Sequence, residues 1–229
     1  MSTIKYFTAF RLNGIIRCMG ITLSVALLLF LGTSCKDKEN PITKAPPAFS
    51  ATPVDMAYDP ADSSCGDIIF VAPVLTPFGA ALPPDYAQKS RFIEYFTVIG
   101  APVRAVTHGT VDTIIENPVE QGDCQIWIVS LPGADYTVIY NHVVNKMVLD
   151  GSFVGPDTIL GQAGTWNDSM GWAALAVSVG EGTDQRWYCP LRFGDSAFVE
   201  DHRRLLEEYT RRGFAPAYDS LCLQGVVGP

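Results

Sequence analysis

Short apolar or alternating runs, separated by turn-forming residues, constrain this chain more than any other feature of its sequence. Gly, Pro, Asn and Asp stand between the runs, which is the pattern of β-strands joined by tight turns. The glycines are expected to supply the positive φ that such turns need. The sequence therefore predicts a mainly β fold. The predicted strands span residues 68–74, 92–98, 103–106, 111–115, 126–130, 136–140 and 173–179.

One segment near the C-terminus has helical spacing instead. Phe198, Leu205 and Tyr209 fall on one face of a helix. Asp195 or Ser196 can serve as its N-cap. We expect this helix to pack on the sheet through its apolar face, and docking of a partner on that face is the alternative.

The first 34 residues have the organisation of a bacterial secretory signal. Basic residues precede an uncharged, largely apolar run that is too short to span a membrane comfortably. Small residues then lead directly into Cys35, which resembles a lipobox, the sequence at which a cysteine is lipidated. We therefore expect residues 1–34 to be a lipoprotein signal peptide and Cys35 to anchor the protein, with the outer membrane as the expected site and the domain facing the periplasm or the cell surface. Ordinary signal cleavage, with Cys35 as a plain thiol, is the alternative.

Three further regions follow the expected signal. Residues 35–62 are rich in proline and predict an extended tether from the anchor. Residues 63–192 hold the predicted strands of the β-domain, and residues 193–229 are expected to form a helix and tail packed on it. Loss of the signal removes three basic residues and no acidic one, which takes the formal charge from −8 to −11. Such a charge argues against nucleic acid or an anionic membrane surface as the partner.

The cysteine count favours disulfides in the exported part of the chain. Of six cysteines, one lies in the expected signal and Cys35 is the lipid site, which leaves an even number in an oxidising compartment. Two disulfides are plausible, and we expect one to join the two flanks of the β-domain through Cys65 and Cys222. The disulfide candidates are Cys65, Cys124, Cys189 and Cys222.

A succession of motifs in the β-region resembles the lysostaphin-type (LytM-like) metallopeptidases, which cut peptide cross-links in bacterial peptidoglycan. The motifs are Gly-Ala-Pro-Val-Arg-Ala-Val at 100–106, Gly-Thr-Val at 109–111, Thr-Val-Ile-Tyr-Asn-His-Val at 137–143 and Gly-Ser-Phe-Val at 151–154. The resemblance implies a duplicated-hybrid-motif β-sandwich. A similar glycine and valine pattern occurs in lipoyl domains and efflux adaptors, but the carrier lysine and the long heptad helices of those proteins are not found here.

The resemblance also implies a zinc site that this chain does not complete. In the family, zinc is held by a histidine, an aspartate four residues later and the second histidine of an HxH pair, while two further histidines act on the attacking water. The corresponding positions hold Ser90 and Glu94 for the first two ligands, and Trp172 and Ala174 for the HxH pair. His142 matches the histidine of a Tyr-x-His segment. The chain has three histidines, and the last lies on the predicted helix, so no register yields an HxH pair.

These residues predict a degenerate groove without metal or cofactor, lined by Ser90, Glu94, Trp172 and Ala174 beside His142. Trp172 could stack on a ligand or simply fill the space of lost ligands, and His142 could be catalytic or only packed. The alternative is a non-standard zinc set of Glu94 and His142 with Asp112 or Asp168 as the third ligand.

The expected function follows from this groove and from the signal. We expect a lipid-anchored envelope protein that has lost hydrolysis and acts as a cell-wall-associated binding module or a regulator of amidases. Its expected partners are peptidoglycan or a cell-wall hydrolase, and the membrane through the lipid anchor. The alternative is an active peptidoglycan metalloendopeptidase with the non-standard metal set.

Overall fold

The computed structural model describes residues 46–70, 76–130, 135–214 and 221–228. The described residues all belong to one compact unit. The expected signal peptide and the lipid site Cys35 therefore lie outside the described residues. Within those residues, no helix combines the length and the apolar character that crossing a membrane requires.

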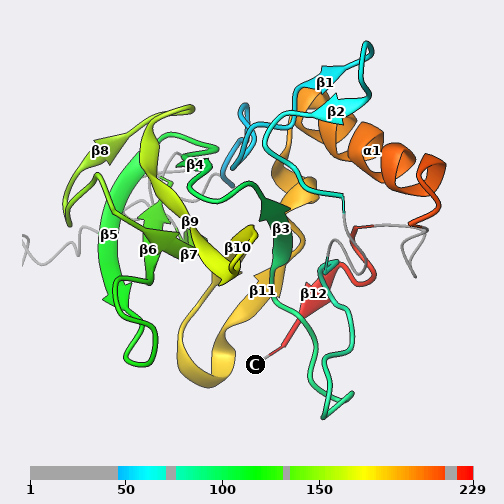
Figure 1. Ribbon diagram of the computed structural model, residues 1–229. Helices are drawn as coiled ribbons and strands as arrows, with labels where there is room; N and C mark the ends of the chain where they lie inside the picture. Colours follow the sequence, from blue (N-terminus) through cyan, green and yellow to red (C-terminus); the bar gives the residue numbers. More distant parts are fainter. Residues whose placement is uncertain (1–45, 71–75, 131–134, 215–220, 229) are drawn as a thin grey trace, which may run out of the picture. The chain divides into compact units, whose positions relative to one another are not determined.

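The described part of the chain is mainly β, with one α-helix near the C-terminus, which confirms the predicted fold class (Figure 1). Ten strands form one antiparallel sheet, and two short strands, β1 and β2, form a separate hairpin. The strands are β1 Tyr58–Asp59, β2 Ser64–Cys65, β3 Ile93–Thr97, β4 Pro102–Arg104, β5 Gly109–Glu116, β6 Cys124–Val129, β7 Tyr136–Val144, β8 Phe153–Val154, β9 Ile159–Asn167, β10 Met170–Val179, β11 Arg186–Tyr188 and β12 Val226–Val227. The helix is α1 Ser196–Arg211, and Gly182–Asp184 and Pro190–Phe193 are 3-10 turns.

Strand β10 is the strand on which the sheet branches. One edge of β10 pairs first with β3 and then with β11, while the other edge pairs first with β9 and then with β7. Strands β7 and β9 also pair with each other where they meet β10. Four different strands are therefore placed by the hydrogen bonds of one strand.

Strand β9 is not among the predicted strands, because the sequence pattern assigns its glycines to turns. Gly161 and Gly164 have no positive φ, and both lie inside the strand. A Cβ on Gly161 would approach Val143 Cγ1 to 2.6 Å, and one on Gly164 would approach the carbonyl oxygen of His142 to 3.2 Å. These glycines are needed for close approach of β9 to β7 and not for chain reversal.

Two other predicted elements differ at their limits. The predicted strand at 68–74 is represented by a lone bridge between Ile68 and Thr97, and residues 71–74 lie outside the described residues. The predicted helix is confirmed as α1, and its N-cap is Asp195, whose side chain accepts a hydrogen bond from the Phe198 amide at 2.8 Å.

Helix α1 is attached to the sheet by a buried polar contact that the apolar pattern did not predict. His202 is 1% exposed, and its Nδ1 lies 2.7 Å from the Phe198 carbonyl oxygen. A carbonyl can only accept, so Nδ1 carries the ring proton and Nε2 accepts from the Tyr95 hydroxyl of β3 at 2.8 Å. Burial lowers the pKa of His202 to about 4. The ring is therefore a neutral link between helix and sheet.

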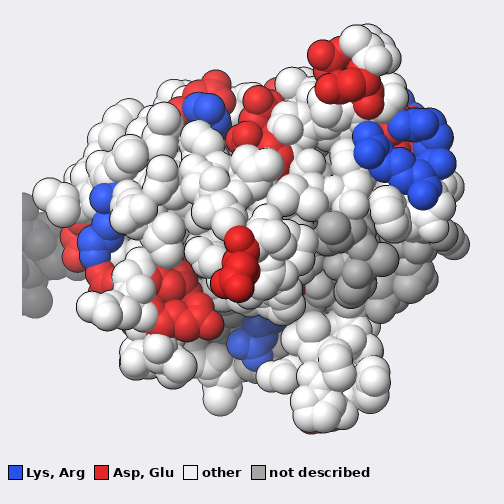
Figure 2. Space-filling model, in the orientation of Figure 1, with Lys and Arg blue, Asp and Glu red and all other residues white. Residues whose placement is uncertain are grey.

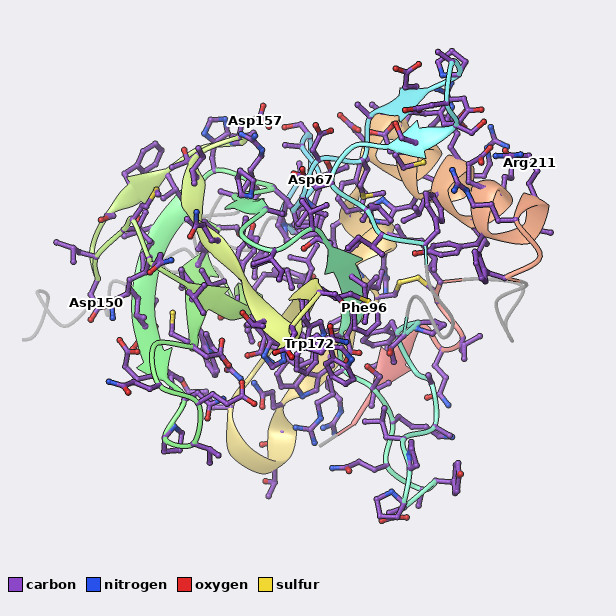
Figure 3. All side chains as sticks on the ribbon, viewed as in Figure 1. Asp67, Phe96, Asp150, Asp157, Trp172 and Arg211 are labelled. Carbon is purple, nitrogen blue, oxygen red and sulfur yellow. A yellow bond between two sulfur atoms is a disulfide. The ribbon has the colours of Figure 1, made fainter. Side chains whose placement is uncertain are left out.

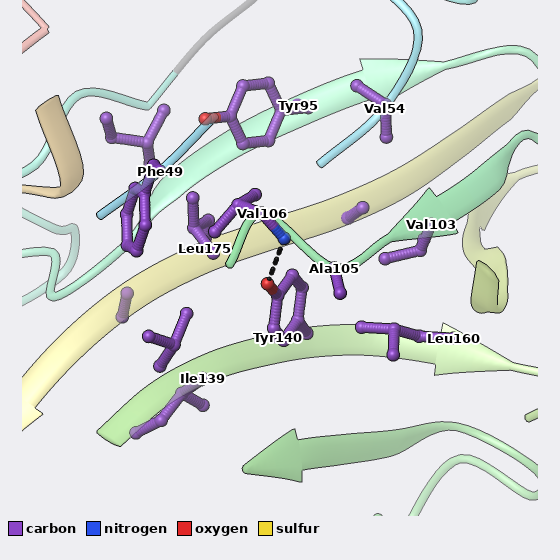
Figure 4. Packing of buried hydrophobic residues seen from close by; sticks show 14 of the residues in the cluster. Phe49, Val54, Tyr95, Val103, Ala105, Val106, Ile139, Tyr140, Leu160 and Leu175 are labelled. Carbon is purple, nitrogen blue, oxygen red and sulfur yellow. Dashed lines mark hydrogen bonds between the residues drawn. The ribbon is translucent and has the colours of Figure 1, made fainter. Parts of the chain in front are cut away.

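Tyr140, Leu175 and Leu160 pack together in the buried core (Figure 4). The Tyr140 hydroxyl is fully buried there and accepts a hydrogen bond from the Val106 amide at 2.7 Å. A buried phenol without such a partner would be costly, so this bond fixes the loop after β4 against β7.

The proline-rich segment expected as a tether packs on the domain over its described part. Phe49 and Val54 are fully buried. The Phe49 amide donates to the Phe193 carbonyl at 2.8 Å, and the Asp195 amide donates to the Phe49 carbonyl at 2.9 Å. Residues from Phe49 onward therefore belong to the folded domain, and this part of 35–62 is not an extended tether.

The expected pairing of Cys65 with Cys222 is wrong. Cys222 is bonded to Cys189, while Cys65 and Cys124 are buried free thiols. The cause is the pairing of β11 with β12, which brings the C-terminal segment beside the end of β11. A disulfide does join the C-terminal flank to the β-domain, and in the described chain it is one bridge instead of two.

Candidate functional site

Three neighbouring strands bring most of the predicted groove residues together. Ala174 of β10 lies directly opposite Glu94 of β3 on one side and Asn141 of β7 on the other. Trp172 precedes Ala174 by two residues and so shares its face of the strand. Glu94, Ala174 and Asn141 thus form a row across the sheet, with His142 at one end of it.

The His142 ring lies flat against Trp172. The two ring centroids are 3.3 Å apart and the planes differ by 18°. His142 has a φ of +60° within β7, which turns its side chain out of the alternation of the strand. Trp166 contacts the edge of Trp172 and also Phe96, so these three rings form an aromatic cluster behind the face that His142 covers. Figure 3 shows Phe96 and Trp172 close together. Trp172 therefore fixes the plane of the His142 ring.

Two polar side chains determine where the nitrogens of His142 point. Nδ1 lies 3.2 Å from Asp123 Oδ2, and Nε2 lies 3.0 Å from Asn141 Nδ2. Asp123 lies in the β5–β6 turn and is 4% exposed. Burial opposes ionisation of Asp123, but hydrogen bonds from His142 and Asn117 hold its pKa below its usual range. The half-buried His142 and the buried Asp123 are therefore an oriented pair.

Ser90 and Glu94 are held in separate surroundings. The Ser90 hydroxyl is buried and donates to the Phe92 carbonyl at 2.9 Å. Burial raises the pKa of Glu94, against a hydrogen bond from Thr76 and the charge of His142. Ser90 is thus engaged in its own turn, and Glu94 is a half-buried carboxyl group beside the row.

The residues at the family's zinc position do not fit zinc. Of Ser90, Glu94 and Ala174, only Glu94 offers a ligand of the kind that zinc prefers, whereas a catalytic zinc needs three protein ligands. The indole at 172 and the methyl group at 174 occupy the face where two imidazoles would be required. No catalytic step through zinc can be assigned at this position.

A different group of ligating side chains lies next to the row. One ligand atom from each of Glu120, Asp123 and His142 lies within 4.8 Å of the other two. In the described residues this is the one group of three such side chains, and it contains neither Asp112 nor Asp168, which lie on β5 and in the β9–β10 turn. Sequence reasoning missed Glu120 and Asp123 because they belong to a turn with no recognisable motif.

Two hollows open on the face of the sheet that carries this row. The larger, of about 520 Å³, lies over the start of β7 and the end of β10, and the smaller, of about 250 Å³, lies beside His142. Trp127 lines the larger hollow and Gln125 the smaller one, and the indole Nε1 donates to Gln125 Oε1 at 3.1 Å. The larger hollow contains Asp112, Asp135 and Glu181, so it favours a cationic group.

The basic side chains are concentrated elsewhere. Figure 2 shows the broadest group of Lys and Arg atoms on its face at the position of α1. There Arg203 and Arg211 are already paired with Glu200 and Glu208 at 2.6 and 2.7 Å. This surface is a set of i,i+3 and i,i+4 ion pairs and offers no free cationic platform.

Comparison with known proteins finds similar structures but no similar sequence family. No protein-family model matches the chain, and no curated protein matches it. The solution structure of lysostaphin is 20% identical, with 47% of this chain and 44% of that chain covered and a TM-score of 0.40. The catalytic domain of lysostaphin from Staphylococcus simulans is 19% identical over 46% of this chain and 79% of that one, with a TM-score of 0.39.

A zinc-containing peptidase from Vibrio cholerae is 23% identical, with 58% of this chain and 37% of that chain covered and a TM-score of 0.43. The chain thus spans less than half the length of the lysostaphin chain in the solution structure and of the Vibrio peptidase. At these identities and TM-scores the matches do not assign the chain to a family, and the activities of these proteins are not transferred to it.

Proposed function

We propose that this protein is a lipid-anchored component of the bacterial envelope that binds a peptide of the cell wall, or of a cell-wall hydrolase, without cutting it. The observation that carries the proposal is the row formed by Glu94, Ala174 and Asn141, together with Trp172. The row lies where the sequence resemblance places a catalytic zinc, and Glu94 is its one side chain of the kind that zinc prefers. A groove with this lining supports binding of a peptide more than its hydrolysis.

The two hollows suit an extended peptide. They lie over residues Thr137 and Asn141 of the same strand, which are separated by roughly 13 Å at the rise of a β-strand. A peptide of about four residues spans that distance. The acidic lining of the larger hollow favours a peptide with a free amino group at that end.

The proposal is tested by retention of the full chain on purified peptidoglycan sacculi, with released muropeptides measured in the same samples. The matched variants are Trp127→Ala, which removes an indole from the wall of the larger hollow, and Phe153→Ala, which removes an aromatic ring that is 75% exposed on β8. We expect Trp127→Ala to weaken retention by roughly tenfold or more and Phe153→Ala to leave it unchanged.

Each alternative gives a different result. No retention of the wild-type chain would contradict the wall-binding proposal and direct the search to a protein partner such as an amidase. Release of muropeptides that depends on added zinc and is lost in His142→Ala would instead identify a peptidase with a non-standard metal set.

A further inference from the structure

We propose that Glu120, Asp123 and His142 bind one divalent transition-metal ion, at a site separate from the position where the family resemblance places zinc. The three side chains come from two elements: the turn between β5 and β6 carries both carboxylates, and β7 carries the imidazole. This inference does not depend on the proposed function, because it concerns the affinity of these side chains for a metal ion.

Two of the ligands already stand at the separation that coordination requires. Asp123 Oδ2 and His142 Nδ1 are 3.2 Å apart. Tetrahedral zinc with bonds of about 2.0–2.1 Å places neighbouring ligand atoms roughly 3.3 Å apart. Glu120 is exposed, so its side chain can rotate to close the remaining distance, which is at most 4.8 Å. An ion can therefore enter with little movement of Asp123 and His142.

The second oxygen of Asp123 points independently to a missing partner. The Asp123 side chain is 6% exposed, and its Oδ1 is buried and forms no hydrogen bond within the described residues. A buried carboxylate oxygen without a donor is unfavourable, and native proteins rarely leave one unsatisfied. Among the described residues, no lysine or arginine forms an ion pair with Asp123 or Glu120. A bound cation supplies the missing positive charge.

The site is held in place before any ion binds. The Asn117 side-chain oxygen accepts hydrogen bonds from the backbone amides of Val119 and Glu120 at 3.0 and 3.4 Å. The backbone amide of Asn117 donates to the backbone carbonyl of Asp123 at 2.8 Å. These bonds fix the turn that carries both carboxylates. The stacking of His142 on Trp172 fixes the imidazole. Preorganisation of this kind reduces the entropy lost on binding.

The ligand types select the class of ion. One imidazole and two carboxylates suit zinc and other first-row transition ions, whereas magnesium and calcium prefer sites made of oxygen alone. His142 and Asn117 also line the hollow of about 250 Å³, so a fourth ligand can reach the ion from that side. Three protein ligands with one open position are the arrangement of a zinc site that takes an exogenous ligand.

Metal binding should also turn the side-chain amide of Asn141. In the present arrangement Asn141 Nδ2 lies 3.0 Å from His142 Nε2 and can donate to it. An ion at Nδ1 moves the ring proton to Nε2, which then becomes a donor. The Asn141 amide must therefore turn to present its oxygen, and it becomes the outer partner that orients the ligating imidazole.

The test is a calorimetric titration of the full chain with zinc chloride after removal of metal with EDTA. We expect one equivalent of zinc to bind, with affinity at least tenfold lower in Glu120→Gln and in Asp123→Asn. Asp112→Asn, which removes an exposed carboxylate from β5 outside the group, should bind zinc as the wild type does. Because Glu120 is exposed, its variant tests the proposal even if Asp123→Asn does not fold. X-ray absorption of the zinc complex should show nitrogen and oxygen ligands and no sulfur.

Absence of zinc binding would overturn the proposal, as would binding that survives Glu120→Gln or depends on Asp112. Sulfur in the coordination shell would assign the ion to a cysteine instead. Retention on sacculi, measured with EDTA and again with zinc, separates the two proposals: retention without zinc binding refutes the metal site alone, and zinc binding without retention refutes the wall-binding function alone.

Discussion

Acidification should destabilise the fold through His202, the neutral imidazole between α1 and β3. Its pKa of about 4 lies below the ordinary value of 6.5, because burial disfavours the charged ring. The unfolded chain therefore takes up a proton first as the pH falls, and stability is lost between about pH 6.5 and pH 4. At 1.36 kcal/mol for each pH unit, the full effect is about 3 kcal/mol, and about 2 kcal/mol of it falls between pH 7 and pH 4.5.

The assay is urea unfolding, followed by tryptophan fluorescence, at pH 7 and at pH 4.5. The variant His202→Gln has no titrating ring, so its loss of unfolding free energy should be smaller than that of the wild type by about 2 kcal/mol. The wild type must be compared with His202→Gln, because other groups also change the stability on acidification. Carboxyl groups with raised pKa, such as Glu94 and Asp201, stabilise the fold as the pH falls and so oppose the effect of His202.

A matched control keeps the titrating ring and removes its partner. Tyr95→Phe deletes the hydroxyl that donates to Nε2, which should cost about 1 kcal/mol at both pH values and preserve the pH dependence. Equal losses of stability in the wild type and in His202→Gln would refute the reasoning, because they would show that other groups account for the acid sensitivity.

Three further predictions concern stability. Gly161→Ala should lower the free energy of unfolding in urea by about 1–3 kcal/mol, because its Cβ would meet Val143 Cγ1 at 2.6 Å. Gly225→Ala, whose Cβ would meet nothing within 4 Å, should lower it far less, and equal losses would contradict the close-approach argument. Cys222→Ser opens a bridge between residues separated by 33 positions and should cost about 3–4 kcal/mol, whereas Cys65→Ser should leave the sensitivity of stability to reductant intact, as measured by thermal unfolding with and without dithiothreitol. Asp195→Ala should lower helix stability by about 1 kcal/mol through loss of the cap on Phe198, with Ser196→Ala as the control that leaves unfolding unchanged.

The sequence predicts an element correctly where a local pattern of apolar residues determines its structure. The alternation at 111–115 and 126–130 and the helical spacing after Asp195 each correspond to an observed element, since these patterns reflect one buried face. The pattern failed at Gly161 and Gly164, because close approach of two strands and chain reversal both select glycine. It also failed for the disulfide, because pairing of β11 with β12 is a long-range contact that cysteine spacing does not encode.

In the candidate site, too, some residues are predicted from the sequence and others are found only in the structure. Glu94, Trp172, Ala174 and His142 were predicted as one groove from the resemblance, and the register of β3, β10 and β7 places Glu94 opposite Ala174, with Trp172 stacked on His142. Whether these residues act as the groove of a binding protein stays a prediction. Asp123 and Glu120 could not be foreseen, because their approach to His142 depends on how a short turn folds back on β7.

The burial of Phe49 against the far end of the chain has a consequence for the order of events during synthesis. Phe49 is synthesised well before Phe193, Asp195 and Phe198, which supply its backbone hydrogen bonds and its ring contacts. Phe78 likewise waits for hydrogen bonds with Leu221 and Leu223. The nascent chain therefore lacks these partners of two fully buried phenylalanines until the segment through Leu223 has been made. During that period such a chain depends most on factors that prevent aggregation.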